Sequence, residues 1–262
     1  MSSHVASLNA SGDSGNRAAI HHTPSTKSRQ TCATRANANG SFSRVKDEPT
    51  GLRMPEDVRA AARDALGGDE LRHEFAWMSW AGTVWRLEGE HRVVYVKRAA
   101  HLADERDRLA WLRGRWPVPE LIGLYHGFGD DWLLTHAVRG VPISDRSIDW
   151  PAERVAVRMG EILRGLHSTD ANDCPFGEPG QGHVLVHGDY CLPNVLVENG
   201  ELSALVDVGG AGLGDPQVDL AAGVWTLRYN YGPGHAREFL EAYGWKPLSD
   251  TQIEKLRRRY AR

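Results

Sequence analysis

The sequence predicts an α+β fold, because segments with strand patterns and segments with helical patterns both occur and follow one another along the chain. Aromatic and β-branched residues over 71–98 are typical of an antiparallel meander. Apolar side chains recur at helical spacing over 151–168. A chain of 262 residues can form one large domain or two lobes that share a cleft.

The N-terminal segment, residues 1–53, is expected to be disordered. It is rich in Ser, Asn, Ala, Thr and Gly and has almost no large apolar residues, so it can bury too little surface to offset the entropy of ordering. A helix is predicted from Pro55, which a first turn tolerates, to Gly67-Gly68, which ends it. Three strands are then predicted, over 74–82, 83–89 and 92–98.

Lys97 ends the third of these strands, and the next helix is predicted over 102–114. Glu105 falls on the apolar stripe of that helix, together with Leu109 and Leu112. Because a carboxylate that points inward needs a cationic partner, we expect Glu105 to pair with Lys97.

The remaining elements are a hairpin and a series of helices. A break at Pro117 and Pro119 leads into two strands, and a long helix begins at Pro151. His167, at the end of that helix, is expected to be a core or capping residue. The strands cover 121–128 and 132–138, and later helical patterns cover 216–230, 235–244 and 250–260.

The stretch 182–221 carries the residues on which the functional prediction depends. A short strand ends in His187-Gly188-Asp189, and Asn194 begins a second strand. Asn199-Gly200 predicts a tight type I′ turn, because both residues tolerate positive φ. The third strand, over 202–208, carries Asp207.

The expected hairpin register places Asn194 opposite Leu205. Because side chains alternate faces, Asn194 and Asp207 would be diagonal neighbours on one face, about 7 to 8 Å apart or less. Their oxygens could then reach one Mg²⁺ ion. With Asp189 in the adjoining loop to deprotonate a hydroxyl, this is the arrangement that phosphoryl transfer requires.

Two motifs resemble a known family. HGDYCLPN followed by DVGGAGLGDPQVDLA resembles the signature of the aminoglycoside phosphotransferase family, and ERDRLAWL followed by PVPEL is similar to its N-lobe helix and the turn after it. The resemblance implies a bilobal, protein-kinase-like α+β fold. Residues 54–137 would form a nucleotide-binding N-lobe with an antiparallel sheet and a helix, and residues 138–262 a mainly helical catalytic C-lobe.

The resemblance also implies a role for individual residues. Asp189 would be the catalytic base, and Asn194 and Asp207 would bind Mg²⁺. The pair of Lys97 and Glu105 would hold the α- and β-phosphates of ATP or GTP, although it could also be an ordinary ion pair.

Three further residues are assigned to the nucleotide site by the same resemblance. Ser79, in MSWAGTVWRL, would contact phosphate from the covering loop, or would simply be a turn residue. Thr135 and Val138 would bound the hinge, where backbone groups bind adenine. Asp219 would brace the catalytic loop as structural support.

The sequence departs from the family pattern in the acceptor region. Antibiotic kinases of the family usually carry a long helical insert before the HGD loop, but here only GEPGQGHVLVH separates Phe176 from Gly188. Gly210 stands where an Arg is common, and the stretch RRRYAR has none of the acidic residues that the family carries near its C-terminus. The acceptor site is therefore expected to be abbreviated.

Composition excludes several other classes. A net charge of −3 provides no general basic field for nucleic acid. Cys32, Cys174 and Cys191 lie in unrelated contexts, which argues against a disulfide framework or a zinc site. There is no run of apolar residues long enough to span a membrane, and no glycine-rich P-loop or dinucleotide-binding motif. We therefore expect a cytoplasmic protein whose partners are a nucleotide and a small molecule; the sequence does not predict its oligomeric state.

The functional prediction is an ATP-dependent phosphotransferase that acts on a hydroxyl of a small molecule, with an aminoglycoside as the leading acceptor. Another metabolite is the alternative acceptor. A metal-dependent hydrolase built from His187, Asp189 and Asp207 is a rival from another class. It leaves Lys97, Glu105 and Asn194 without a purpose. A degenerate kinase-like binding protein is the non-enzymatic rival.

Overall fold

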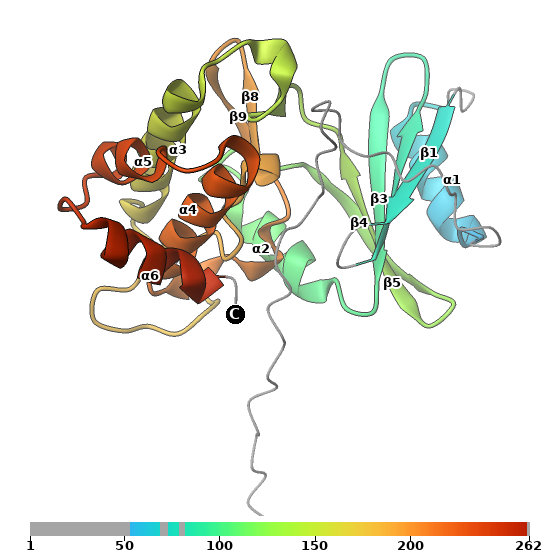
Figure 1. Ribbon diagram of the computed structural model, residues 1–262. Coiled ribbons are helices and arrows are strands. Elements are labelled where there is room, and N and C mark those ends of the chain that lie inside the picture. The colour runs from blue at the N-terminus through green and yellow to red at the C-terminus, as the bar shows by residue number, and fades with distance from the viewer. Residues whose placement is uncertain (1–52, 69–72, 79–81, 261–262) are drawn as a thin grey trace, which may run out of the picture.

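The computed structural model describes residues 53–68, 73–78 and 82–260, and Figure 1 shows two lobes on either side of a central helix, α2. The expected residue 1–53 tail and Ser79 lie outside the described residues, except Arg53. The helices are α1 (Glu56–Ala65), α2 (Ala103–Leu112), α3 (Ala152–His167), α4 (Gln217–Tyr231), α5 (Ala236–Tyr243) and α6 (Asp250–Tyr260). The predicted α+β class is confirmed.

The first lobe contains a five-stranded antiparallel sheet in the order β1-β2-β3-β5-β4. Its strands are β1 (His73–Met78), β2 (Thr83–Glu88), β3 (Val93–Ala99), β4 (Leu121–Gly127) and β5 (Asp130–His136). Side chains alternate in β3, so Val94 and Val96 are fully buried beneath α1, together with Trp85 and Trp132. Lys97, one residue on from Val96, projects from the opposite face of the sheet.

Helix α2 belongs to the larger hydrophobic core of the molecule. Its Leu109 and Leu112 are buried with residues of α3, α4 and α5, whereas the side chains beneath α1 form a separate cluster. The helix also touches the segment that follows β9, since it packs against the short 3₁₀ helix η3 (Val208–Gly210). The apolar stripe of α2 was predicted from the sequence, and the family resemblance assigned the helix to the N-lobe; in the structure this stripe packs with the helices of the second lobe.

The second lobe is mainly helical, as expected. Helices α3 and α5 pack on each other, and α4 packs on α6. The predicted stripe of α3 is buried, with Val155, Met159 and Leu166 at most 2% exposed. Its short strands are β6 (Val141–Pro142), β7 (Val184–Val186), β8 (Val195–Glu198), β9 (Glu201–Leu205) and β10 (Gly212–Gly214), and its 3₁₀ helices include η1 (Arg146–Ile148) and η2 (Leu192–Asn194).

The predicted register of the β8–β9 hairpin is wrong beyond its tip. Glu198 pairs with Glu201 around the Asn199-Gly200 turn as expected, but Leu205 pairs with Val195 and not with Asn194. The register shifts between Leu196, which faces Ala204, and Val197, which faces Leu202, so Ser203 is the extra residue of a β-bulge.

Asn194 and Asp207 are consequently outside the strands that were expected to carry them. Asn194 ends η2, directly before β8, and Asp207 follows β9 in a left-handed backbone conformation with φ of 59°. They are therefore not a diagonal pair on one face of a hairpin. Within the described residues, no helix has the length and hydropathy needed to cross a bilayer.

Candidate active site

The expected ion pair between Lys97 and Glu105 is present and has a third member. The Lys97 ammonium lies 2.6 Å from Oε2 of Glu105 and 2.5 Å from Oδ1 of Asp207. The Lys97 and Glu105 side chains are 15% and 11% exposed, whereas that of Asp207 is 47% exposed. One ammonium thus joins β3, α2 and the segment after β9.

The three charges shift one another's pKa values. Burial lowers the pKa of Lys97, but the Asp207 and Glu105 carboxylates outweigh it, so the pKa lies above its ordinary value. Burial, together with the nearby Asp207 carboxylate, raises the pKa of Glu105 above its ordinary value against the opposing effect of the Lys97 ammonium. For Asp207, burial is opposed by the ammonium of Lys97, which holds the pKa below its ordinary value. The ammonium of Lys97 therefore lies between one carboxylate whose pKa is lowered, Asp207, and one whose pKa is raised, Glu105.

Helix α2 also positions the loop that carries Asp207. A Cβ atom on Gly209 would lie 3.4 Å from Cβ of Glu105, so the loop runs directly along the helix. Arg108, one turn further along α2, donates from Nε to the carbonyl of Ala211 at 2.6 Å. The segment after Asp207 is therefore held against α2 at Gly209, within η3, and at Ala211, directly after it.

The backbone of the loop after β7 packs directly against the backbone of the segment that follows Asp207. Gly188 has φ of 86°, and a Cβ atom there would lie 2.4 Å from the carbonyl oxygen of Gly210. Only glycine provides both the positive φ and the space. Gly210 lies three residues after Asp207, and Gly188 lies directly before Asp189. This close approach therefore brings together the loop of Asp189 and the loop of Asp207, the two acidic loops of the site.

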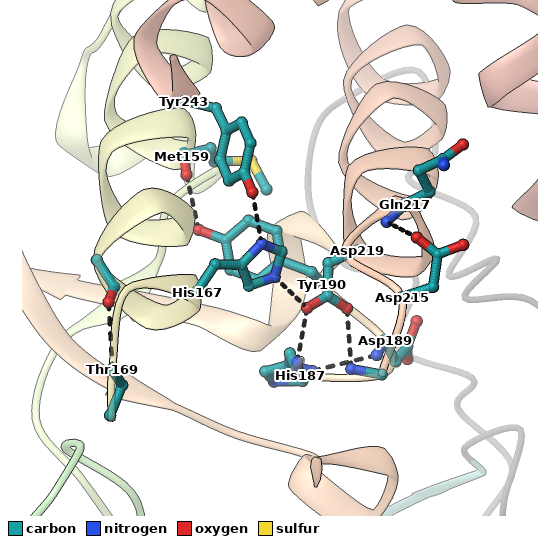
Figure 2. Close-up of polar contacts among 12 residues, drawn as sticks. Met159, His167, Thr169, His187, Asp189, Tyr190, Asp215, Gln217, Asp219 and Tyr243 are labelled. Atoms are coloured by element: carbon teal, nitrogen blue, oxygen red, sulfur yellow. Dashed lines mark hydrogen bonds and ion pairs between the residues drawn. The ribbon is translucent and has the colours of Figure 1, made fainter. Parts of the chain in front are cut away.

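Asp219, fully buried at the start of α4, fixes the loop that carries Asp189 (Figure 2). Its Oδ2 accepts from the amide of His187 at 2.6 Å, and its Oδ1 accepts from the amide of Gly188 at 2.9 Å. His167 Nε2 lies 3.1 Å from the same carboxylate, and Nδ1 lies 2.9 Å from the hydroxyl of Tyr243. The predicted support role of Asp219 and the core position of His167 agree with these contacts.

Asp189 is partly buried and is surrounded by hydrogen-bond donors. Asn194 donates from Nδ2 to the backbone oxygen of Asp189 at 2.9 Å and to its Oδ2 at 3.1 Å. On the other side, Oδ1 accepts from the hydroxyl of Tyr260 and from Sγ of Cys191 at 3.4 Å. The carboxylate is thus fixed in orientation by residues from η2 and from α6.

Oxygen ligands for a hard cation are present in this region. The amide nitrogen of Asn194 is bonded to Asp189, which leaves Oδ1 of Asn194 for a cation, and the carboxylate of Asp207 is half exposed. Mg²⁺ prefers oxygen ligands and is usually held by one or two protein groups together with phosphate oxygens. Over the described residues, no group of three or more His, Cys, Asp or Glu side chains is arranged to hold a metal ion.

A cavity of about 770 Å³ lies at the end of the sheet where the hinge was expected from the sequence. Val138 lines it, together with Tyr95 of β3, whose side chain is on the same face of the sheet as Lys97. Thr135 does not line it: it is paired within β5, opposite Tyr95 on one side and Leu121 on the other.

Two residues of the site were not found from the sequence. Tyr95 stands two residues before Lys97, so strand alternation alone could have placed it on the face of the ammonium. Tyr260 is 71 residues from Asp189, and no local pattern could have brought it there. It reaches the carboxylate only because α6 packs on α4.

Comparisons with known proteins show the family of the chain. A family model described as the phosphotransferase enzyme family matches residues 74–183 and 178–257. A probable aminoglycoside 3'-phosphotransferase of Lactococcus lactis is 46% identical over 158 residues, which are 44% of this chain and 60% of that protein. An aminoglycoside 3'-phosphotransferase of Streptomyces ribosidificus is 30% identical over 222 residues, which cover 62% of this chain and 83% of the relative.

Solved structures extend the similarity to the fold. The crystal structure of an aminoglycoside-3'-phosphotransferase of type VIII has a TM-score of 0.62 and 28% identity, and the match covers 77% of this chain and 96% of that one. An aminoglycoside phosphotransferase of Streptomyces rimosus in complex with ADP and streptomycin has a TM-score of 0.58 at 22% identity, covering 80% and 98%. The expected bilobal, kinase-like fold is confirmed.

Proposed function

Because this chain belongs to the phosphotransferase enzyme family, we propose that it transfers the γ-phosphoryl group of ATP to a hydroxyl of a small molecule, with an aminoglycoside as the leading acceptor. The observation that carries the proposal is the placement of Lys97, Glu105 and Asp207 in one charge cluster, beside the loop of Asp189. Phosphoryl transfer depends mainly on positioning and on neutralising negative charge, and this cluster supplies both.

Asp189 is the proposed catalytic base. Its carboxylate orients the acceptor hydroxyl and takes its proton while the hydroxyl oxygen bonds to the γ-phosphorus. The bond from the γ-phosphorus to the bridging oxygen breaks, and ADP leaves with that oxygen. The bond from Asn194 to Oδ2 and the bracing of the loop by Asp219 support this role, because both restrict the orientation of the carboxylate.

Lys97 is the proposed ligand of the α- and β-phosphates, and Glu105 holds its ammonium in place. The buried position of Glu105 supports these two roles. Its carboxylate is too deep to meet the nucleotide itself and accepts a hydrogen bond from Nζ of Lys97. Asp207, which is half exposed, is free to exchange its contact with Lys97 for a metal ion when phosphates bind to the ammonium.

Mg²⁺ is the proposed metal, with Asp207 and Oδ1 of Asn194 as its protein ligands. When bound, it neutralises charge on the phosphate oxygens. The oxygen-only donor set and the exposure of Asp207 support this choice over a softer metal.

The nucleotide base is proposed to bind in the hinge cavity. The ring of Tyr95 lines it, and aromatic faces stack well on planar bases. The backbone amides of His136 and Ala137 donate to the backbone carbonyls of Glu120 and Val93. Because those two amides are engaged, we propose the amide of Val138 as the hydrogen-bond donor to the base. We propose ATP as the donor, with GTP as the alternative, and Thr135 as a residue that supports the hinge through the sheet.

The acceptor is the less constrained part of the proposal. Two relatives carry the name aminoglycoside 3'-phosphotransferase, which supports an aminoglycoside. The segment between Phe176 and β7 is a short loop, so a smaller amino- or hydroxyl-bearing metabolite is the alternative acceptor.

The experiment has two stages. Thermal-shift titration with ATP and Mg²⁺, and separately with GTP and Mg²⁺, measures nucleotide binding. A coupled ADP assay over a panel of aminoglycosides and small metabolites then measures transfer. We expect stabilisation by ATP and ADP release that depends on an acceptor. Stabilisation without acceptor-dependent ADP would favour a binding protein, and product release with metal but no nucleotide would favour a hydrolase.

A further inference from the structure

The hydroxyl of Tyr260 donates to Oδ1 of Asp189, the carboxylate proposed as the catalytic base. Tyr260 is the last residue of α6 and is partly buried. Its ring lies against Trp225 of α4, with the centroids 5.4 Å apart, and its hydroxyl is 3.3 Å from Sγ of Cys191. The contact with Asp189 is therefore held by the packing of α6 on α4, which Figure 1 shows side by side.

The two oxygens of Asp189 have different partners. Oδ2 is bonded to Asn194, which is a buried residue of the adjoining 3₁₀ helix. Oδ1 faces α6 and receives the phenolic hydroxyl. An acceptor must present an uncharged hydroxyl to this carboxylate and donate its proton to it. The Tyr260 hydroxyl is a group of that same kind, bonded in the way that the acceptor hydroxyl must be.

From this contact we propose that Tyr260 is a specificity-determining residue of the acceptor site, whose hydroxyl occupies the acceptor's place on Asp189 until an acceptor exchanges with it. The inference rests on the proposed phosphotransferase function and adds a residue to its acceptor site. An alcohol can replace the phenol without leaving the carboxylate unpaired, because one O–H donor takes the place of another. Water must also displace the Tyr260 hydroxyl before Asp189 can activate it, so the contact slows hydrolysis of the nucleotide.

The contacts that hold α6 determine how much of the helix must move before Tyr260 releases Asp189. Arg257 and Arg258 both bond Glu254 within the helix, and Arg259 bonds Gln217 and Asp215 at the start of α4. The contacts of Arg259 thus tie the helix to the start of α4 beside Tyr260. Rotation of the tyrosine side chain, or a small shift of the last turn, is sufficient to free Oδ1 without moving the whole helix.

The test is Tyr260→Phe, which removes the hydroxyl and keeps the ring on Trp225. We expect the acceptor KM to fall about tenfold, since the acceptor no longer displaces a charge-assisted hydrogen bond. Acceptor-independent ADP formation should rise, because water can now reach Oδ1. Tyr229→Phe is the matched control: Tyr229 stacks on the same Trp225 at 5.1 Å, is exposed, and should leave both quantities unchanged.

A second measurement uses the wild-type protein, so it does not depend on the variant folding. Nitration of Tyr260, quantified by peptide mapping against Tyr229, should become faster when acceptor is present. An unchanged acceptor KM in Tyr260→Phe would overturn the assignment, as would a fall in kcat alone, which would make the hydroxyl a support for the base. Slower nitration with acceptor would overturn it too. Wild-type protein that binds no nucleotide would instead overturn the proposed function, and this inference with it.

Discussion

Lys97 and Glu105 lie on elements that belong to different hydrophobic cores, and their side chains meet at 2.6 Å. Lys97 is on β3, whose other face is covered by α1, and Glu105 is on α2, which is buried with the helices of the second lobe. Both side chains are largely shielded from water. An ion pair in such a place is costly to break from one side, because the remaining charge is left buried.

Lys97→Met should lower the free energy of unfolding by about 3 kcal/mol and abolish stabilisation by ATP and Mg²⁺. It leaves Glu105 and Asp207 without their cation and removes the proposed phosphate ligand. Chemical denaturation and thermal-shift titration measure the two effects. Arg98→Met is the control, since Arg98 is the next residue of β3 and pairs with Asp130. Unimpaired ATP binding in Lys97→Met would refute the phosphate role.

Asp189→Asn should reduce phosphoryl transfer by about 10²- to 10⁴-fold while nucleotide binding is retained. The amide keeps the size of the side chain but cannot take the proton of an acceptor hydroxyl. The coupled ADP assay and the ATP thermal shift test the two statements on one preparation. Asp173→Asn, at an exposed ion pair with Arg115, should behave as wild type. Transfer at the wild-type rate in Asp189→Asn would remove this residue as the base.

Asp219→Asn should cost about 3 kcal/mol of unfolding free energy and lower kcat. The carboxylate accepts from two backbone amides, at His187 and Gly188, and lies beside His167. An asparagine has only one accepting oxygen, so a buried amide loses its partner and the loop of Asp189 loosens. Urea denaturation and steady-state kinetics check this. A destabilised variant with normal kcat would show that Asp219 supports the fold and not the loop geometry.

Gly188→Ala should be more damaging than Gly182→Ala, although both glycines have positive φ. At Gly182 a Cβ atom meets nothing within 4 Å, so only the cost of the left-handed conformation applies, about 1 kcal/mol. At Gly188 the same atom collides with the carbonyl of Gly210, and the two acidic loops must separate. We expect transfer activity to be lost in Gly188→Ala and kept in Gly182→Ala. Equal activity in the two variants would contradict the close approach of the loops.

The pKa of Asp207 is lowered from its ordinary 3.8, because the Lys97 ammonium outweighs the burial that opposes it. A carboxylate with a lowered folded-state pKa stabilises the protein above the ordinary value, and that contribution is lost as the pH falls through the folded-state value. The stability difference between wild type and Asp207→Asn, measured without metal, should therefore shrink below about pH 4. The pKa of Glu105 is raised, so Glu105→Gln should show the opposite trend. A difference that does not vary with pH in Asp207→Asn would argue against the ion pair.

Most of the fold could be predicted from local patterns. The meander, the β4–β5 hairpin, and the helices α3 to α6 follow from strand alternation, helical spacing and Gly or Pro at the boundaries. The Asn199-Gly200 turn was also correct at its tip. The bulge at Ser203 was not predictable, because the residue has no unusual φ requirement. Its hydroxyl donates to the carbonyl of Arg139, a contact that exists only after the chain has folded.

The site was predictable where one residue constrained the next. An inward-facing carboxylate at Glu105 required a cation, and Lys97 was the candidate at the end of the preceding strand. Asp219 and His167 also have the surroundings that their positions suggested. The positions of Asn194 and Asp207 relative to the hairpin were wrong, since a single inserted residue shifts the register. Tyr260 depends on the docking of α6 on α4, which no periodicity in the sequence encodes.

Both carboxylates that flank Lys97 are attached to the larger core, Glu105 directly through α2 and Asp207 through the loop that α2 grips at Gly209 and Ala211. The ammonium alone is carried by the sheet. If the sheet and α1 rotate as one body over a bound nucleotide, the positive charge travels with them, whereas its two negative partners keep their spacing. Closure of the lobes would then change the distances from the Lys97 ammonium to the carboxylates of Glu105 and Asp207. These two distances therefore depend on the degree of lobe closure.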